Sequence, residues 1–415
     1  METFQKNIEI MSPVGSYESL MAAIQAKANS VYFGIENLNM RSNSVYNFTL
    51  NNLKEIVEIA HQNNIKAYLT VNTIIYDEDI ELMKTIIDTA VKNNIDAIIA
   101  SDMAAIEYAY GNGAEVHIST QMNISNFEAV KYFSKYCDVI VLARELNINQ
   151  IKSIYNSIVR EKITGPKGNL IRLELFAHGA LCMSISGKCY LSLHEYNKSA
   201  NRGECLQLCR RGYTVTDKET QRQLDIENEY IMSPKDLCTI DFLDKIIDAG
   251  ISVLKIEGRA RSPEYVKTVT ECYREAISSI REGNYNKEKI EEWKTRLSKV
   301  FNRGFWDGYY LGRRLGEWSN VYGSKATIKK VYVGKCNNYF SKIKVAEFII
   351  ETGSMKVGDK ILIIGPSTGV IETNVTEIRV DYKNVDETKK GERCSIPVEN
   401  TIRRNDKLYI LVPNN

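Results

Sequence analysis

Short apolar runs alternate with longer amphipathic segments through the first two thirds of the chain. The apolar runs are IEIMS at residues 8–12, SVYFG at 30–34, KAYLTVN at 66–72, DAIIAS at 96–101, EVHIST at 115–120, DVIVLARE at 138–145, RLELFAHG at 172–179 and SVLKIEG at 252–258. Most are followed by a segment whose apolar positions recur at helical spacing, such as TLNNLKEIVEIAHQNN at 49–64. Strands that alternate with helices are typical of a parallel sheet.

Eight such units predict an α/β fold, and their number favours a closed (β/α)8 barrel of the TIM type. An open doubly wound sheet is the alternative. The seventh unit is unusual because a long insertion separates RLELF from the predicted helix SPKDLCTIDFLDKIIDAG at 233–250. Loops between a strand and its helix normally have about 2 to 6 residues, and much longer ones are usually functional or disordered.

The pattern of apolar and polar residues changes after this region. A helix that ends in an aromatic and glycine-rich turn is predicted for EEWKTRLSKVFNRGFWDGYYLG at 291–312. From about residue 325, runs such as KIKVAEFIIE and KLYILVP are separated by Gly, Asn and Asp turns, which predicts a small antiparallel β-barrel. We therefore expect a barrel domain at 1–290 with a cysteine-bearing loop at 177–238, a linker at 291–324 and a β domain at 325–415.

Charge and hydropathy restrict the partners. Lys and Arg total 54 against 52 Asp and Glu, so the net charge of +2 gives no general attraction to nucleic acid or to an anionic membrane. A nucleic-acid partner would have to be held by a local patch. The chain shows neither a signal-peptide pattern nor an apolar run long enough to span a bilayer. We expect a cytoplasmic protein without a membrane partner.

Five of the nine cysteines crowd into the insertion and the segment after it. They are Cys182, Cys189, Cys205, Cys209 and Cys238, whereas Cys137, Cys272, Cys336 and Cys394 are scattered and are expected to be small buried hydrophobes. Loops that follow the strands of a (β/α)8 barrel gather at one mouth, so all five thiols are predicted to converge there. Four thiolates can ligate zinc or an iron–sulfur cluster, and the wide spacing favours the cluster. Unliganded buried thiols are the alternative.

Two local features near these cysteines suggest chemistry. Ser233 is a candidate helix N-cap with Pro234 at the first helical position, which would point the positive end of a helix at the site and lower the pKa of Cys238. His178 lies four residues before Cys182 and would form a Cys–His nucleophile if the chain turns between them, which Gly179 permits.

Polar residues at the predicted strand ends form a candidate active-site ring, although each alone also fits a structural role. The candidate catalytic residues are His178, Glu174, Glu257 and Arg259, and the candidate substrate-binding residues are Asn72, Gln121, Arg144, Glu145, Arg202, Arg210 and Arg211. Arg144 and Arg259 suit a dicarboxylate or a phosphate. The three arginines of the insertion make a basic patch that suits a nucleic-acid backbone, or else a solvated loop.

Residues 174–192 resemble the signature of the collagenase-like peptidase family U32. The matching positions are Glu174, Phe176, His178, Gly179, Ala180, Leu181, Cys182, Ser186, Gly187, Cys189 and Ser192. NRGECLQLCR at 201–210, SPKDLC at 233–238, KIEGRARSPEYV at 255–266 and FNRGFWDGYYLG at 301–312 are similar to later motifs of the family.

The resemblance implies a function. It is strongest to the branch of tRNA hydroxylation proteins, which carry a 4Fe-4S cluster and form 5-hydroxyuridine at the wobble position without O2, with prephenate as the oxygen donor. It implies Cys182, Cys189, Cys205 and Cys238 as ligands, with Cys209 as a spare thiol or a replacement for Cys205. Two alternatives stay open. One is a peptidase that uses Cys182 and His178, and the other is an RNA-binding accessory subunit that works with a paralogous partner subunit.

Overall fold

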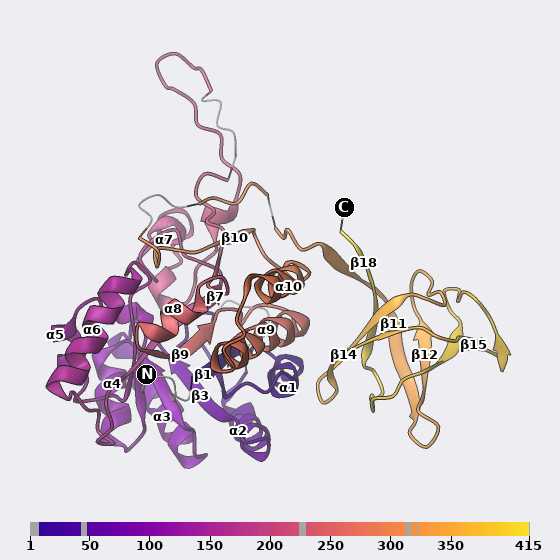
Figure 1. The fold of residues 1–415 in the computed structure, drawn as a ribbon, viewed down its shortest axis with the longest axis horizontal. Helices are drawn as coiled ribbons and strands as arrows, with labels where there is room; N and C mark the ends of the chain where they lie inside the picture. The colour runs from indigo at the N-terminus through magenta and orange to yellow at the C-terminus, as the bar shows by residue number, and fades with distance from the viewer. Residues whose placement is uncertain (1–7, 43–47, 224–229, 313–316, 322, 415) are drawn as a thin grey trace.

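A closed barrel of parallel strands forms the larger part of the molecule. The computed structural model describes residues 8–42, 48–223, 230–312, 317–321 and 323–414 (Figure 1). Within them, β1 to β7 pair in chain order, and β9 closes the ring by pairing with both β7 and β1. The strands are β1 (Glu9–Pro13), β2 (Ser30–Gly34), β3 (Lys66–Val71), β4 (Ala97–Ala100), β5 (Val116–Ile118), β6 (Val139–Val141), β7 (Arg172–Gly179) and β9 (Ile251–Ile256). The predicted (β/α)8 barrel is confirmed, and the β9 pairings exclude the open sheet.

Helices cover the outside of the barrel, as Figure 1 shows. They are α1 (Tyr17–Gln25), α2 (Leu53–Gln62), α3 (Ile80–Lys92), α4 (Met103–Gly111), α5 (Phe127–Phe133), α6 (Ile148–Glu161), α8 (Leu243–Asp248) and α9 (Pro263–Arg281). Their apolar spacing explains the arrangement: α2 buries Leu53, Ile56, Val57 and Ala60, which share one face. No helix in the described part of the chain is long and apolar enough to cross a membrane.

The insertion after β7 contains a short strand where a helix start is predicted. The insertion carries α7 (Leu191–Tyr196) and ends in β8 (Asp236–Cys238), which pairs antiparallel with β7, His178 facing Cys238. Ser233 does not cap a helix, because its Oγ accepts a hydrogen bond from Arg210 and α8 begins only at Leu243. The helix N-terminus predicted at Ser233 is therefore wrong: the backbone of β7 beyond the barrel offers strand pairing, and that long-range pairing overrides the local Ser-Pro signal.

The segment after α9 returns to the barrel. Helix α10 (Lys287–Ser298) buries Trp293 and Leu297, and the predicted domain limit at residue 290 falls inside it. Strand β10 (Phe305–Trp306) then pairs with β8. Further along, the Ser319 amide donates to the Ser233 carbonyl at 2.7 Å. The chain that leaves the barrel is thus bound to the end of the insertion.

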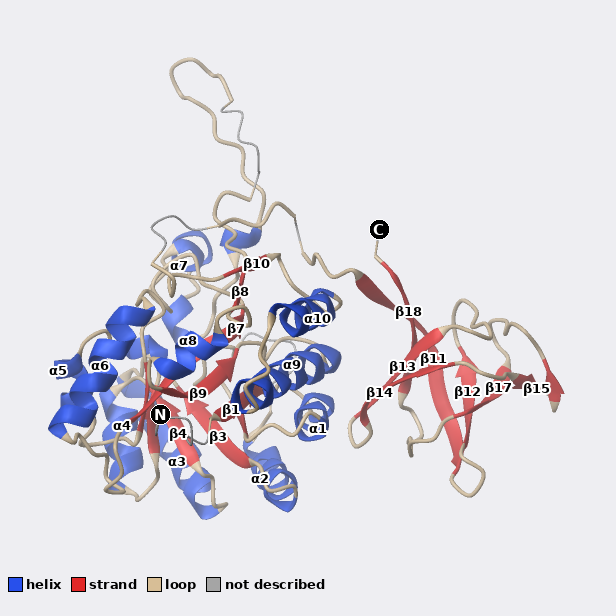
Figure 2. Cartoon of the chain, in the orientation of Figure 1, coloured by secondary structure: helices blue, strands red, loops and turns tan. Residues whose placement is uncertain are grey.

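The C-terminal part forms a separate antiparallel sheet (Figure 2). Its strands are β11 (Ile328–Phe340), β12 (Val345–Ile350), β13 (Lys360–Gly365), β14 (Gly369–Asn374), β15 (Arg379–Val380), β16 (Lys383–Asn384), β17 (Arg393–Pro397) and β18 (Lys407–Pro413). Among the described residues they run in the order β14-β13-β18-β11-β12-β17-β15-β16. The sheet contacts the barrel through Gln25 of α1, whose side chain donates to the Thr368 carbonyl at 2.8 Å and accepts from the Val370 amide at 2.9 Å.

Candidate functional site

A cavity of about 170 Å³ lies at the mouth of the barrel, where the strands end and the insertion folds over them. Its floor comes from the strand ends and the loops that follow, which supply Tyr32, Thr70, Asn72, Gln121, Arg144, Lys255 and residues 257–261. Its cover comes from the insertion, which supplies Leu181, Ser186 and the cysteines. The active-site position predicted from a (β/α)8 barrel therefore contains a real cavity.

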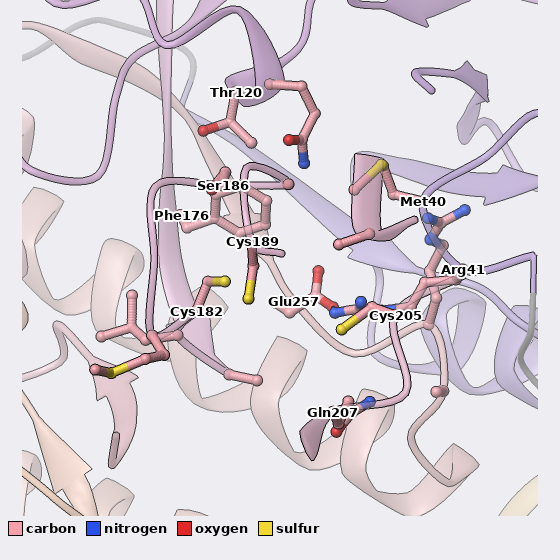
Figure 3. A pocket seen from close by; sticks show the side chains of 18 of the residues that line it. Met40, Arg41, Thr120, Phe176, Cys182, Ser186, Cys189, Cys205, Gln207 and Glu257 are labelled. Carbon is pink, nitrogen blue, oxygen red and sulfur yellow. The ribbon is translucent and has the colours of Figure 1, made fainter. Parts of the chain in front are cut away.

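Four of the five clustered thiols line this cavity. They are Cys182, Cys189, Cys205 and Cys209. In Figure 3 the Cys182 and Cys189 sulfurs point into the same space, with Cys205 beside Arg41 and Glu257. Burial raises the pKa of the Cys209 thiol; Arg210 opposes this, and the nearby thiols of Cys182, Cys205 and Cys189 add to it. The Cys209 thiol is therefore close enough to the other three thiols for their charge to affect it.

Cys238 does not join them. It is 4% exposed on β8, it is absent from the cavity lining, and the Tyr273 hydroxyl lies 4.0 Å from its sulfur. Burial raises the pKa of Cys238 to about 12, whereas a helix N-terminus would have lowered it. The predicted convergence of all five thiols is wrong for Cys238, because the strand pairing of β8 turns this residue into the core.

His178 also lies in the core and not beside Cys182. It is 1% exposed, it contacts the rings of Tyr265, Tyr273 and Phe305, and its Nδ1 lies 3.4 Å from the Tyr273 hydroxyl. The polar partner of the Cys182 sulfur is the Ser184 hydroxyl at 3.6 Å. The predicted Cys–His nucleophile is therefore not assembled. Gly179 does turn the chain, with φ +108°, but the turn separates the two side chains.

The buried imidazole predicts a pH dependence of stability. Burial, with a smaller contribution from Arg261, lowers the pKa of His178 from 6.5 to about 3. The unfolded chain therefore binds a proton below pH 6.5 that the folded chain does not accept until about pH 3. We expect the free energy of unfolding to fall over this window, by up to about 1.4 kcal/mol per pH unit. Denaturant unfolding at pH 7 and pH 5 should show a larger loss for the wild type than for His178→Gln, and equal losses would contradict the prediction.

The cavity is strongly cationic. Its lining contains the cations Arg41, Arg144, Arg210, Lys255, Arg259 and Arg261, and Glu257 is its one carboxylate among the described residues. Arg41 donates to Glu257 at 2.6 Å. Burial alone would raise the pKa of Glu257, but Arg41, Arg144 and Arg259 lower it to about 2, so the carboxylate stays charged.

The two predicted strand-end arginines keep donors available at the cavity. Arg259 Nη1 donates to Asn39 at 3.0 Å and to Thr70 at 2.9 Å, and burial lowers its pKa to about 10, so it remains a cation at neutral pH. Arg144 stacks 3.9 Å over the ring of Phe176, and its buried Nε has no hydrogen-bond partner among the described residues. The hydrogen-bond partners of both guanidinium groups are neutral, and Glu257 is the carboxylate of the cavity lining that acts on their charge.

Glu174 lies behind the cavity wall. It is fully buried and accepts from Lys255 Nζ at 3.0 Å, while Lys255 itself reaches the cavity and lies 4.4 Å over the ring of Tyr32. Sequence reasoning predicts Glu174 but misses Lys255 and Arg41. The position of Lys255 inside a predicted buried strand was a usable signal for that residue. Arg41 follows β2 by seven residues (34 to 41), which is too far for a strand-end rule.

The other predicted binding residues separate into two groups. Asn72 and Gln121 line the cavity, and Glu145 lies in a neighbouring groove. The basic patch of the insertion is not formed, because Arg202 is paired with Asp79 and Arg210 donates to the carbonyls of Leu181 and Pro234, both at 2.6 Å. Arg211 is exposed and lies beside Tyr196. Two of the three arginines therefore hold the insertion together, which the local charge pattern does not reveal.

The four cavity thiols match the ligand chemistry of an iron–sulfur cluster. Within the described ranges, no group of three or more His, Cys, Asp or Glu side chains is arranged to hold a single metal ion. A cluster takes several thiolate ligands, and the surrounding cations would stabilise the negative charge of a thiolate-bound cluster. The residues present therefore fit a cluster.

Comparison with known proteins shows the family of the chain. The family model of peptidase family U32 matches residues 15–320. A collagenase of Porphyromonas gingivalis is 61% identical over 97% of this chain and 97% of its own length. The tRNA hydroxylation protein P1 of Bacillus subtilis is 32% identical over 89% of this chain and 87% of its own length. A 23S rRNA 5-hydroxycytidine synthase of Escherichia coli is 33% identical over 76% of this chain and 47% of its own length. The chain therefore belongs to peptidase family U32.

Proposed function

We propose that this protein is an iron–sulfur RNA hydroxylase that converts the wobble uridine of tRNA to 5-hydroxyuridine, with prephenate as the oxygen donor. The observation that carries the proposal is the placement of Cys182, Cys189, Cys205 and Cys209 around one cationic cavity. Relatives named for tRNA and rRNA hydroxylation, at 32% and 33% identity, support the class of reaction.

The four cavity thiols would hold the cluster. Cys209 takes the place that the family resemblance assigns to Cys238, since Cys209 lines the cavity and Cys238 does not. A 4Fe-4S cluster bound there would supply one-electron chemistry at the cavity wall. Arg210 lies next to Cys209 in the chain, and it fixes this part of the insertion through the Leu181 carbonyl, one residue before Cys182. The chain thus ties two of the ligand segments together.

The floor of the cavity suits a small dicarboxylate such as prephenate. Arg144 and Arg259 have neutral partners, and a guanidinium group binds a carboxylate through paired hydrogen bonds. Arg41 is held by Glu257, which orients its guanidinium group beside Cys205. These cations would bind and orient an anionic donor, while the cover formed by the insertion would limit the access of water.

A hydrolytic function has less support. The name collagenase belongs to the Porphyromonas gingivalis relative, and peptide hydrolysis by Cys182 would need a general base close to its sulfur. His178 is buried within β7 and lies against Tyr273, whereas Cys182 lines the cavity. We therefore favour the hydroxylase over the peptidase.

The test is mass spectrometry of tRNA nucleosides from a deletion strain. We expect 5-hydroxyuridine and its derivatives to be lost, and to be restored by the wild type and by Cys394→Ala, a buried cysteine of the C-terminal sheet. Cys182→Ala should not restore them, because it removes a cluster ligand. Unchanged 5-hydroxyuridine in the deletion strain would contradict the proposal. Full activity of the isolated chain on tRNA would exclude an accessory role that needs a paralogous partner subunit.

A further inference from the structure

A second groove opens beside the cysteine cavity and shares part of its wall. Arg144, Leu181, Cys182, Met183 and Ser186 line both hollows. The far wall of the groove is formed by Trp306, Tyr309 and Trp318, which follow α10 in the chain. A molecule bound in the groove would therefore lie next to one bound in the cavity, with Cys182 between them.

The far wall presents aromatic rings in fixed positions. Trp306 and Tyr309 pack edge to face with ring centroids 5.1 Å apart. Trp318 is 38% exposed, and its backbone is held by a bridge to Pro234 and by the neighbouring Ser319 amide, which donates to Ser233. A large indole surface that is kept in place and left exposed at a cavity rim is suited to stacking against a flat ligand.

The groove also contains donors that lack acceptors. The indole nitrogen of Trp306 and the Nε of Arg144 are both buried, and neither has a hydrogen-bond partner in the described parts of the chain. Both groups can only donate, and a buried donor without an acceptor costs about 1 to 3 kcal/mol. Both donor atoms are enclosed by protein, so the surface that a planar ligand can cover in the groove is the aromatic wall, above all the exposed ring of Trp318. A nucleobase is a planar ligand of this kind.

We propose that this groove binds an unpaired nucleobase next to the target nucleotide, stacked on Trp318. The inference rests on the proposed function, because it takes single-stranded RNA as the substrate of the adjacent cavity. The groove itself is lined by one cation, Arg144, and one carboxylate, Glu145, while the neighbouring cavity is lined by six cations and one carboxylate among the described residues, which favours an anionic chain that reaches from one to the other. Stacking on aromatic side chains is a common way to hold unpaired bases.

The test measures RNA binding and not catalysis. The purified full-length protein is titrated with a fluorescently labelled anticodon stem-loop RNA at fixed salt, and the dissociation constant is compared between variants. Trp318→Leu should weaken binding about tenfold or more, because it removes a stacking partner. Trp318→Phe should retain most of the affinity. Tyr382→Leu, which removes a fully exposed aromatic ring at the distant β15–β16 turn, should bind as the wild type does.

Unchanged RNA affinity in Trp318→Leu would overturn the inference. If that variant had also lost its binding of a gelatin peptide, the groove would be assigned to a peptide. The iron content of each variant is measured in parallel to show that the cysteine site is intact. The two proposals can fail separately. If RNA binding depends on Trp318 but deletion of the protein leaves 5-hydroxyuridine unchanged, the proposed reaction is refuted and the assignment of the groove stands.

Discussion

Cys209→Ser is expected to abolish the iron–sulfur cluster and, with it, RNA hydroxylation. The thiol lines the cavity with Cys182, Cys189 and Cys205, and a serine hydroxyl is a much poorer ligand for a cluster than a thiolate. After anaerobic purification and reconstitution, the iron and sulfide content of the variant should fall below about one tenth of the wild-type content. The tRNA of cells in which this variant is the only copy of the protein should contain no 5-hydroxyuridine.

Cys238→Ser provides the matched control. It makes the same chemical change in a buried thiol that points into the core beside Tyr273. We expect this variant to keep its cluster and to lose only stability. If Cys238→Ser lost the cluster while Cys209→Ser kept it, the ligand set implied by the family resemblance would be right and the set proposed from the structure would be wrong.

Lys255→Met is expected to destabilise the barrel by about 3 to 5 kcal/mol. Glu174 is fully buried, and Lys255 Nζ, 3.0 Å away, is its hydrogen-bond partner, while the second carboxylate oxygen of Glu174 has none in the described residues. Removal of one member of a buried ion pair leaves the other charge uncompensated, which carries a cost of this size. Chemical denaturation at pH 7 measures the difference in the free energy of unfolding.

The double variant separates charge from packing. Glu174→Leu combined with Lys255→Met removes both charges and keeps apolar volume at both positions, so most of the lost stability should return. If the double variant were as unstable as Lys255→Met alone, the loss would come from packing around β7 and β9 and not from an unpaired carboxylate.

The barrel could be predicted because its signals are local and repeat. All eight barrel strands fall on the apolar runs of the sequence, since each of them is buried on both faces and therefore reads as a continuous apolar segment. The signal for the C-terminal strands, short apolar runs separated by turn residues, is equally local. In both regions, neighbouring residues decide the structure that they form.

The candidate site was predicted less well because its arrangement depends on long-range pairing. The segment 233–238 carries a good local signal for a helix start, yet its last three residues form β8 because β7 and β10 offer backbone partners from distant parts of the chain. That single change moves Cys238 into the core and leaves Cys209 as the fourth cavity thiol. His178 and Cys182 are close in sequence, but His178 is buried in β7 and Cys182 lines the cavity beyond the strand, which spacing alone does not show.

The binding of residues 305–319 to the end of the insertion has a consequence for how this chain can be divided. Trp306 pairs with Leu237, and the Ser319 amide bonds to the Ser233 carbonyl, so the support of the cysteine cavity is completed only after the last barrel helix. A cut directly after α9 or α10 would remove this support along with the C-terminal sheet. A chimaera that takes its C-terminal sheet from a related chain therefore needs its junction beyond Ser319. The boundary between the two exchangeable parts lies later in the chain than the end of α10.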